Sequence, residues 1–219
     1  MKKKVASRIP DPKTRIEIDG DRSWHNGGDI EIGFYARSCH KAAKKLIATL
    51  DQEPNQKTAW DACPVVLLYR QAVELHLKFL IGDASNFLPS PTDPLTLAKT
   101  HSLRWLAQIV CQIIKACKWE AEFKRDGIFS LADFSALVNE LEELDPVAVA
   151  MRLGNRRRDG LVPSQLQMPN VVRFAKRLDA LLDLLAATAD GLAAAWDLQQ
   201  EGIGEADFGG GDDFTPTIQ

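Results

Sequence analysis

The sequence predicts an all-α fold, a helical bundle of about five helices with one long C-terminal helix. Along four segments apolar residues recur at alternating spacings of three and four, which places them on one face of an α-helix. A fifth segment is apolar on nearly every side, as is typical of a central helix packed by neighbours all round. The chain has no internal repeat. Five helices with apolar stripes are typical of an α-helical bundle.

The first two predicted helices cover residues 29–51 and 58–81. Asp29 is a plausible N-cap of the first helix. Its apolar face consists of Ile32, Ala36, Cys39, Ala43, Leu46 and Leu50. The second helix is the central one, and we expect Gly82 to end it. Pro64 is tolerable there only in or near the first turn, because proline has no backbone N–H with which to continue a helix.

Residues 83–100 contain three prolines and are predicted to form a long connection, of the kind that is often functional. Thr100 or Ser102 then caps a third helix. The apolar face of this helix is Leu103, Leu106, Val110, Ile113 and Cys117. A fourth helix begins at Ser130, with Asp133 in a variant of the capping box. Its apolar face is Phe134, Leu137, Leu141 and Leu144, and Asp145-Pro146 ends it.

After a polar loop over 146–169, Asn170 is expected to cap the longest helix, which runs to near Glu201. Its apolar face is Val171, Phe174, Leu178, Leu181, Leu185, Thr188, Leu192 and Ala195. At about 1.5 Å per residue this helix is long enough to project beyond the bundle or to dimerise.

Three regions follow from this pattern. Residues 1–28 form an extended N-terminal arm, 29–201 the helical bundle domain, and 202–219 a flexible, acidic, glycine-rich tail. The charged N-terminus has no apolar region behind it, so it does not resemble a secretory signal. The longest apolar run is far shorter than the roughly 20 residues of a membrane span. We therefore expect a cytoplasmic protein that does not contact a membrane.

Composition narrows the classes of function. The net charge of −3 provides no overall field that would attract nucleic acid, so any basic surface must be local. The four cysteines include no C-x-x-C pair, which is a poor pattern for zinc, and we expect reduced thiols. Nucleotide-binding glycine loops and the H-E-x-x-H and G-x-S-x-G motifs do not occur. We expect no metal and no cofactor.

Two residues of types that often take part in catalysis, Arg70 and His76, lie on the central helix, in the stretch PVVLLYRQAVELHLKFLIG. Thr100-His101-Ser102-Leu103 opens the next helix, and a later loop runs from Asp145-Pro146 through Arg152 to Asp159-Gly160. In these motifs, over roughly residues 30–200, the sequence resembles the HEPN (higher eukaryotes and prokaryotes nucleotide-binding) superfamily of helical bundles. It is similar to a poorly characterised bacterial group whose loop usually reads Phe-Arg-Tyr-Pro. Here that loop reads Met-Arg-Leu-Gly, so only Arg152 is retained.

Many HEPN proteins are metal-independent ribonucleases with an Arg-x4-6-His motif, which Arg70 and His76 match in spacing. The resemblance implies that His76 would act as general acid/base and that Arg70 would stabilise the phosphorane. In such families the site is usually completed across a dimer. The resemblance thus implies a homodimer that binds RNA or a nucleotide, in a bacterial stress or defence system such as a toxin–antitoxin pair.

The helical wheel supports a different interpretation. At about 100° per residue, Arg70 shares a polar stripe with Gln71, Glu74 and Lys78, whereas His76 lies about 120° from Arg70 among apolar residues. Arg70 and Glu74 are also spaced to form an i,i+4 ion pair. The chain would then be a non-catalytic module that binds RNA, a nucleotide or a protein such as a nucleotidyltransferase-type antitoxin. This hypothesis predicts a buried His76, whereas catalysis requires Arg70 and His76 to face one accessible cleft.

Two further groups are candidates for binding. His101 lies near a helix N-terminus, where the helix dipole favours the neutral form, so it could act as a base or simply pack at the cap. Four arginines of the later loop could hold phosphate or form a solvated basic surface: Arg152, Arg156, Arg157 and Arg158. His25 and His40 have no motif around them.

Overall fold

The computed structural model describes residues 29–52, 59–86, 88, 92–144 and 168–200. Within these ranges the chain forms six α-helices and no named β-strand. The helices are α1 (Asp29–Gln52), α2 (Ala59–Ala84), α3 (Pro94–Lys99), α4 (Leu103–Ala116), α5 (Leu131–Glu143) and α7 (Met168–Gln200). The predicted all-α fold with a long C-terminal helix is confirmed, because α7 spans 33 residues.

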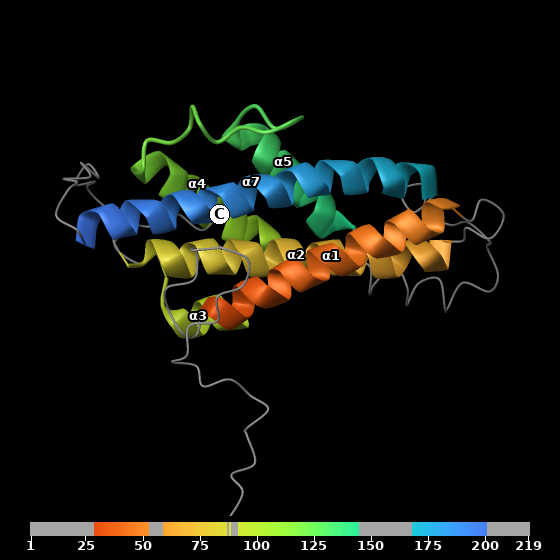
Figure 1. The fold of residues 1–219 in the computed structure, drawn as a ribbon, viewed down its shortest axis with the longest axis horizontal. Helices are drawn as coiled ribbons and strands as arrows, with labels where there is room; N and C mark the ends of the chain where they lie inside the picture. The colour runs from red at the N-terminus through yellow and green to blue at the C-terminus, as the bar shows by residue number, and fades with distance from the viewer. Residues whose placement is uncertain (1–28, 53–58, 87, 89–91, 145–167, 201–219) are drawn as a thin grey trace, which may run out of the picture.

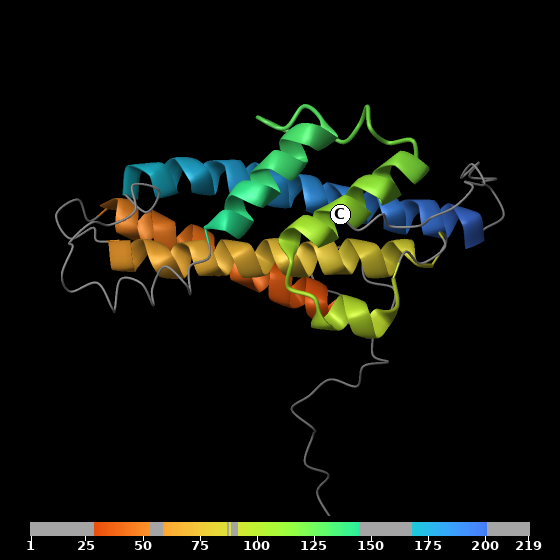
Figure 2. The ribbon, with the colours of Figure 1, turned by 180° about the vertical axis from the view of Figure 1, so that it is seen from behind.

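α2 is the central helix, as its apolar sequence predicts, and it contacts each of the other described helices. The three long helices α1, α2 and α7 lie side by side, and α4 and α5 cross them obliquely on one face (Figures 1 and 2). α5 contacts α2, α4 and α7, which closes the core on that face. None of the described helices is both long and apolar enough to cross a membrane.

The core forms where the predicted apolar faces meet. All five positions of the predicted face of α4 are buried, as are those of α7 from Val171 to Leu192. On α1, Ala36 and Ala43 are buried while the larger members of its face are half-buried against the same core. The 3–4 spacing therefore identified the packing surfaces of these helices correctly.

The predicted end of the central helix is wrong, whereas its predicted start near residue 58 agrees with Ala59. α2 does not end at Gly82 but continues to Ala84. A glycine inside a helix costs only about 1 kcal/mol, and the continuation buries Ala84 and brings Leu88 against the core. Pro64 lies inside α2, beyond its first turn, without ending the helix.

The predicted connection over 83–100 contains a short helix, α3, which the sequence analysis missed. The Asp93 side chain accepts a hydrogen bond from the Thr96 backbone N–H at 2.9 Å, and Pro94 occupies the first turn. An N-cap aspartate followed by proline is a recognised start of a helix. The clustered prolines obscured that local signal.

The helix caps were predicted with mixed success. Ser102 caps α4, and Ser130 caps α5 by accepting from the Asp133 N–H at 3.2 Å, so both predictions are confirmed. The Asp133 carboxylate accepts from the Phe129 N–H at 3.1 Å and from the Ser130 hydroxyl at 2.9 Å. The expected cap at Asn170 is wrong, because α7 begins at Met168. Proline is tolerated in a first helical turn, so Pro169 does not delay the start.

The C-terminus of α4 is closed by a Schellman motif with a lysine where glycine is usual. The Trp119 N–H donates to the Ile114 carbonyl at 3.0 Å, and the Lys118 N–H donates to the Lys115 carbonyl at 3.0 Å. Lys118 adopts a φ of 58°, the left-handed conformation that this motif requires. The motif reverses the chain and directs Trp119 back towards the bundle.

Several predictions lie outside the described residues. They concern the extended N-terminal arm, the helix stop at Asp145-Pro146, the loop with its four arginines and the glycine-rich tail.

The Schellman motif generates a stability prediction. The free energy of unfolding of Lys118→Gly should be about 1 kcal/mol higher than that of Lys118→Ala. Both variants lack the lysine side chain, but only alanine is strained by the left-handed backbone conformation. Urea unfolding followed by far-UV circular dichroism measures the difference. Lys115, in the last turn of α4, is the control: there glycine should be the less stable of the two substitutions, by about 1 kcal/mol. The same order at both positions would contradict the prediction.

Candidate functional site

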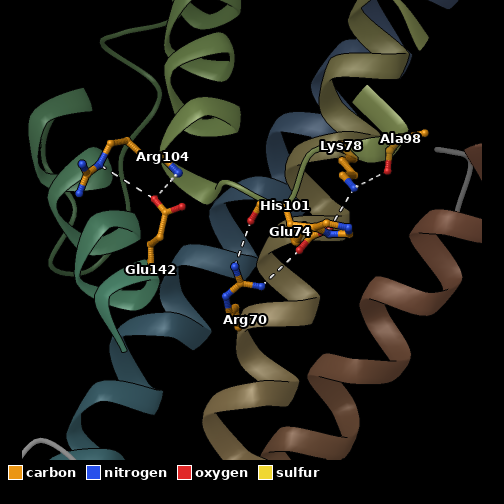
Figure 3. Close-up of polar contacts among 7 residues, drawn as sticks. All are labelled: Arg70, Glu74, Lys78, Ala98, His101, Arg104 and Glu142. Atoms are coloured by element: carbon orange, nitrogen blue, oxygen red, sulfur yellow. Dashed lines mark hydrogen bonds and ion pairs between the residues drawn. The ribbon is translucent and has the colours of Figure 1, made fainter. Parts of the chain in front are cut away.

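A buried carboxylate, that of Glu74 on α2, is the centre of a polar cluster. Only 3% of its side chain is exposed. Its Oε1 lies 3.0 Å from Lys78 Nζ and 2.9 Å from His101 Nδ1, and its Oε2 lies 3.4 Å from Arg70 Nη1. Figure 3 shows Glu74 between Arg70 and Lys78 along α2. Three donors compensate for the loss of hydration that an unpaired buried carboxylate would suffer.

The two cations of the cluster are tied to backbone as well as to Glu74. Arg70 donates from Nη2 to the His101 carbonyl at 3.0 Å, and Lys78 donates from Nζ to the Ala98 carbonyl at 3.2 Å. The Lys78 side chain is only 8% exposed, whereas 22% of Arg70 is exposed. α2 thus holds both ends of the segment from Ala98 to His101, which joins α3 to α4.

His101 is the accessible member of the cluster, with 72% of its side chain exposed. Because the Glu74 carboxylate can only accept, His101 Nδ1 donates to it and Nε2 is the nitrogen that can exchange a proton with a ligand. A carboxylate that fixes an imidazole in this way selects its tautomer and orientation, as in hydrolytic triads. The predicted site residues Arg70, Glu74 and His101 are therefore brought together.

Farther along the same face, Arg104 of α4 reaches α5. Its backbone N–H donates to Glu142 Oε2 at 2.9 Å, and its guanidinium lies near the same carboxylate (Figure 3). The guanidinium also lies 3.9 Å from Glu143. Arg104 also donates from Nε to Asn139 Oδ1 at 3.1 Å. The start of α4 is thereby fixed against α5 on one side and α2 on the other.

His76 lies in a different environment from Arg70. Its side chain is buried, and Nδ1 donates to the Ala72 carbonyl one turn earlier at 2.9 Å. Burial lowers the pKa of His76 to about 4; the hydrogen bond to Ala72 opposes this shift, and positive charge on His40 and Arg37 of α1 reinforces it. A general acid/base needs a pKa near the working pH, which this environment does not provide.

The structure therefore separates the two residues of the Arg-x5-His pattern. Arg70 bonds Glu74 and the start of α4, whereas the electrostatic neighbours of His76 lie on α1. The helical wheel anticipated this separation. The other predicted binding residues, Arg152, Arg156, Arg157 and Arg158, lie outside the described residues.

A second polar cluster, which the sequence analysis missed, joins α1, α2 and α7. Asp179 Oδ1 accepts from His40 Nε2 at 2.7 Å and from the Tyr69 hydroxyl at 2.9 Å. Burial opposes ionisation of Asp179, but these bonds and the charge of Lys44 prevail and lower its pKa. Burial and the Asp179 charge raise the pKa of Tyr69 above its ordinary range.

No local sequence signal could have found this cluster, because His40 and Asp179 are 139 residues apart. Tyr69 sits within the apolar run of the central helix, and it is almost wholly buried there. The usable clue was a tyrosine at a core position, since a buried hydroxyl needs a hydrogen-bond partner. The cluster's geometry is that of a structural clamp between helices.

The four cysteines are unpaired thiols, and two of them, Cys63 and Cys117, are buried. Burial raises the pKa of each of the four, most strongly that of Cys117, to about 11. These thiols are therefore protonated and unreactive near neutral pH. In the described ranges, no group of three or more His, Cys, Asp or Glu side chains could hold a metal ion.

Comparisons of the chain with protein-family models, with curated proteins and with solved structures found no match. The resemblance to the HEPN superfamily therefore stays a prediction from the sequence.

The buried His76 generates a pH prediction. In the unfolded chain it takes a proton as the pH falls below its ordinary pKa of 6.5, whereas in the fold it does so only near pH 4. The contribution of the neutral His76 to the free energy of unfolding is therefore fully present above pH 6.5. It is lost between pH 6.5 and pH 4, by about 3 kcal/mol at 1.36 kcal/mol per pH unit. Urea unfolding of wild type and His76→Gln across this range isolates the effect. Parallel pH profiles for the two proteins would show that His76 does not carry it.

Proposed function

We propose that this chain is a non-catalytic helical module that binds a protein partner through the uncovered half of the α2 stripe, at Leu67 and Gln71, and the adjoining His101. The observation that carries the proposal is the division of the Arg-x5-His pair. His76 is 5% exposed and bonded to Ala72, while Arg70 is bonded to Glu74 and to the His101 carbonyl. This is the geometry expected of a module whose polar stripe organises a surface.

The stripe has a covered half and an uncovered half. At the C-terminal half of α2, Glu74 and Lys78 lie beneath the α3–α4 connection. At the N-terminal half, Gln71 is exposed and Leu67 exposes 45% of its side chain. α3 lies only against the C-terminal half of α2 (Figure 2). An exposed leucine thus adjoins an ordered group of polar side chains.

The charges beside this surface favour a protein over RNA. Arg70 is paired with Glu74, and Arg104 lies beside Glu142 and Glu143, so the cations alternate with carboxylates. Binding RNA without sequence specificity needs uncompensated positive charge along the phosphate backbone. Protein interfaces instead combine apolar contacts and arginine with a polar rim. A second copy of the chain or an antitoxin-type protein would fit this chemistry, in keeping with the role that the HEPN resemblance implies.

Site-specific photocrosslinking in the source cells tests the proposal. A benzophenone amino acid at position 71 should crosslink one discrete protein, whereas the same group at exposed position 183 of α7 should not. Leu67→Lys should reduce the yield at position 71 by about ten-fold or more, because an interfacial leucine would be replaced by a charge. Equal crosslinking from positions 71 and 183, or recovery of RNA in place of protein, would contradict the proposal.

One observation favours a second candidate, metal-independent cleavage of RNA by a different histidine. His101 is exposed, its Nδ1 is held by Glu74, and the Arg70 guanidinium bonds the carbonyl of the same residue. In this arrangement His101 Nε2 would remove the proton of a 2′-hydroxyl as its oxygen attacks the adjacent phosphorus, and Arg70 would stabilise the phosphorane charge. The P–O5′ bond would then break to leave a 2′,3′-cyclic phosphate, and His101 would return the proton to the departing 5′-oxygen. The Arg-x5-His motif would then contribute its arginine, while the acid/base would come from the start of α4.

Cleavage of a labelled single-stranded RNA pool in EDTA tests this candidate. If it is right, His101→Ala should reduce the rate by about 100-fold or more, the usual contribution of a general acid/base. His76→Gln is the matched control and should cleave like wild type. Circular dichroism would verify that each variant is folded. Loss of activity in His76→Gln alone would instead support catalysis by Arg70 and His76. Absence of cleavage by the wild type would contradict the nuclease candidate and leave the non-catalytic binding module as the proposal.

A further inference from the structure

A pocket unrelated to the Glu74 cluster lies between the turn that follows α4 and the C-terminal half of α7. Its volume is about 280 Å³. Small-molecule sites usually span roughly 300–1,000 Å³, so this pocket matches a small ligand. Trp119 and Phe123 form one wall, and Leu184 and Thr188 of α7 form the other.

The aromatic wall is built by local structure. The Schellman motif at Lys118 places Trp119 opposite α7, where its benzo edge lies over Gly191. A Cβ at Gly191 would lie 3.4 Å from Trp119 Cη2, which is ordinary van der Waals contact, so the indole packs directly on α7 at this position. Phe123 is buried and packs edge-to-face on Phe134 with ring centroids 5.3 Å apart. Both rings are therefore held in place before any ligand arrives.

The pocket's charged residues flank Phe123 in the sequence. Lys124 and Arg125 contribute two positive charges and Glu122 one negative charge, and all three are exposed. The turn that carries Arg125 is fixed by paired backbone hydrogen bonds between Arg125 and Ile128, at 2.8 and 2.9 Å. Gly127 makes this turn possible with a φ of 80°. The charged side chains contribute one net positive charge.

We propose that this pocket binds a small planar aromatic carboxylate, with its ring against Trp119 and Phe123 and its carboxylate at Lys124 and Arg125. Aromatic rings stack favourably on an indole, and a carboxylate gains charge-assisted hydrogen bonds from both cations. Glu122 disfavours ligands with two negative charges, so a carboxylate suits the site better than a phosphate. Leu184, which lines the opposite wall, would contact the other face of the ring.

Titration calorimetry of the full chain with 2-naphthoate tests the ligand class. Two matched probes separate its features: 2-naphthamide keeps the ring but lacks the charge, and decahydronaphthalene-2-carboxylate keeps the charge but lacks the planar ring. Both should bind at least about ten-fold more weakly than 2-naphthoate. Equal binding of either probe, or no binding of 2-naphthoate, would overturn the proposal.

Variants locate the binding site. Gly191→Leu, which fills the pocket, and the pair Lys124→Ala with Arg125→Ala should each weaken 2-naphthoate binding by about ten-fold or more. Lys99→Ala with Arg173→Ala removes two exposed cations elsewhere and should leave the affinity unchanged. Thermal unfolding would verify that the variants are folded. If Gly191→Leu does not fold, the Lys124→Ala/Arg125→Ala variant still tests the site. Unchanged affinity in the Lys124/Arg125 pair would overturn the proposal.

Discussion

The arrangement of this bundle depends on a buried negative charge in the middle of its central helix. The Glu74 carboxylate is nearly inaccessible to water, and its environment is tolerable only while Arg70, Lys78 and His101 donate to it. Two donors come from α2 itself, but the third comes from the residue just before the cap of α4. The chain between α3 and α4 is therefore held against α2 by polar contacts, and the position of α4 follows from them.

α2 consequently has two polar faces with different roles. On the side of α4 it displays an ordered group that reaches the surface at His101, with Leu67 and Gln71 beyond it. On the side of α1 it buries His76 and ties Tyr69 to Asp179 of α7. A single helix thus joins the bundle internally and organises an external surface. The separation of Arg70 from His76 is a consequence of this division of α2.

Periodicity in the sequence predicted much of the fold because burial of apolar faces dominates helix packing. The face of α4, the caps at Ser102 and Ser130, and the central position of α2 all followed from short-range patterns. The continuation past Gly82 did not, because tertiary burial outweighed a local preference. α3 was not predicted although Asp93-Pro94 marks its start, because the neighbouring prolines are typical of a loop.

The candidate site was predictable in composition but not in geometry. The i,i+4 spacing of Arg70 and Glu74 gave one ion pair, whereas the approach of His101 depends on how the chain returns to α2 after α3. The clamp at Asp179 and the pocket at Trp119 both involve segments that meet only in the folded bundle. Pairings of this kind are set by three-dimensional packing, which a single sequence does not reveal.

The clamp between His40, Tyr69 and Asp179 has a consequence for how the chain folds during synthesis. α1 and α2 emerge before α7 and can pack against each other, but the acceptor for the Tyr69 hydroxyl and for His40 lies in α7. Until α7 has left the ribosome, the early hairpin exposes the apolar surface that α7 will cover and leaves two polar groups to bind water. Docking of α7 is therefore the step that completes the clamp, and until then the exposed apolar surface of the hairpin is open to non-native contacts.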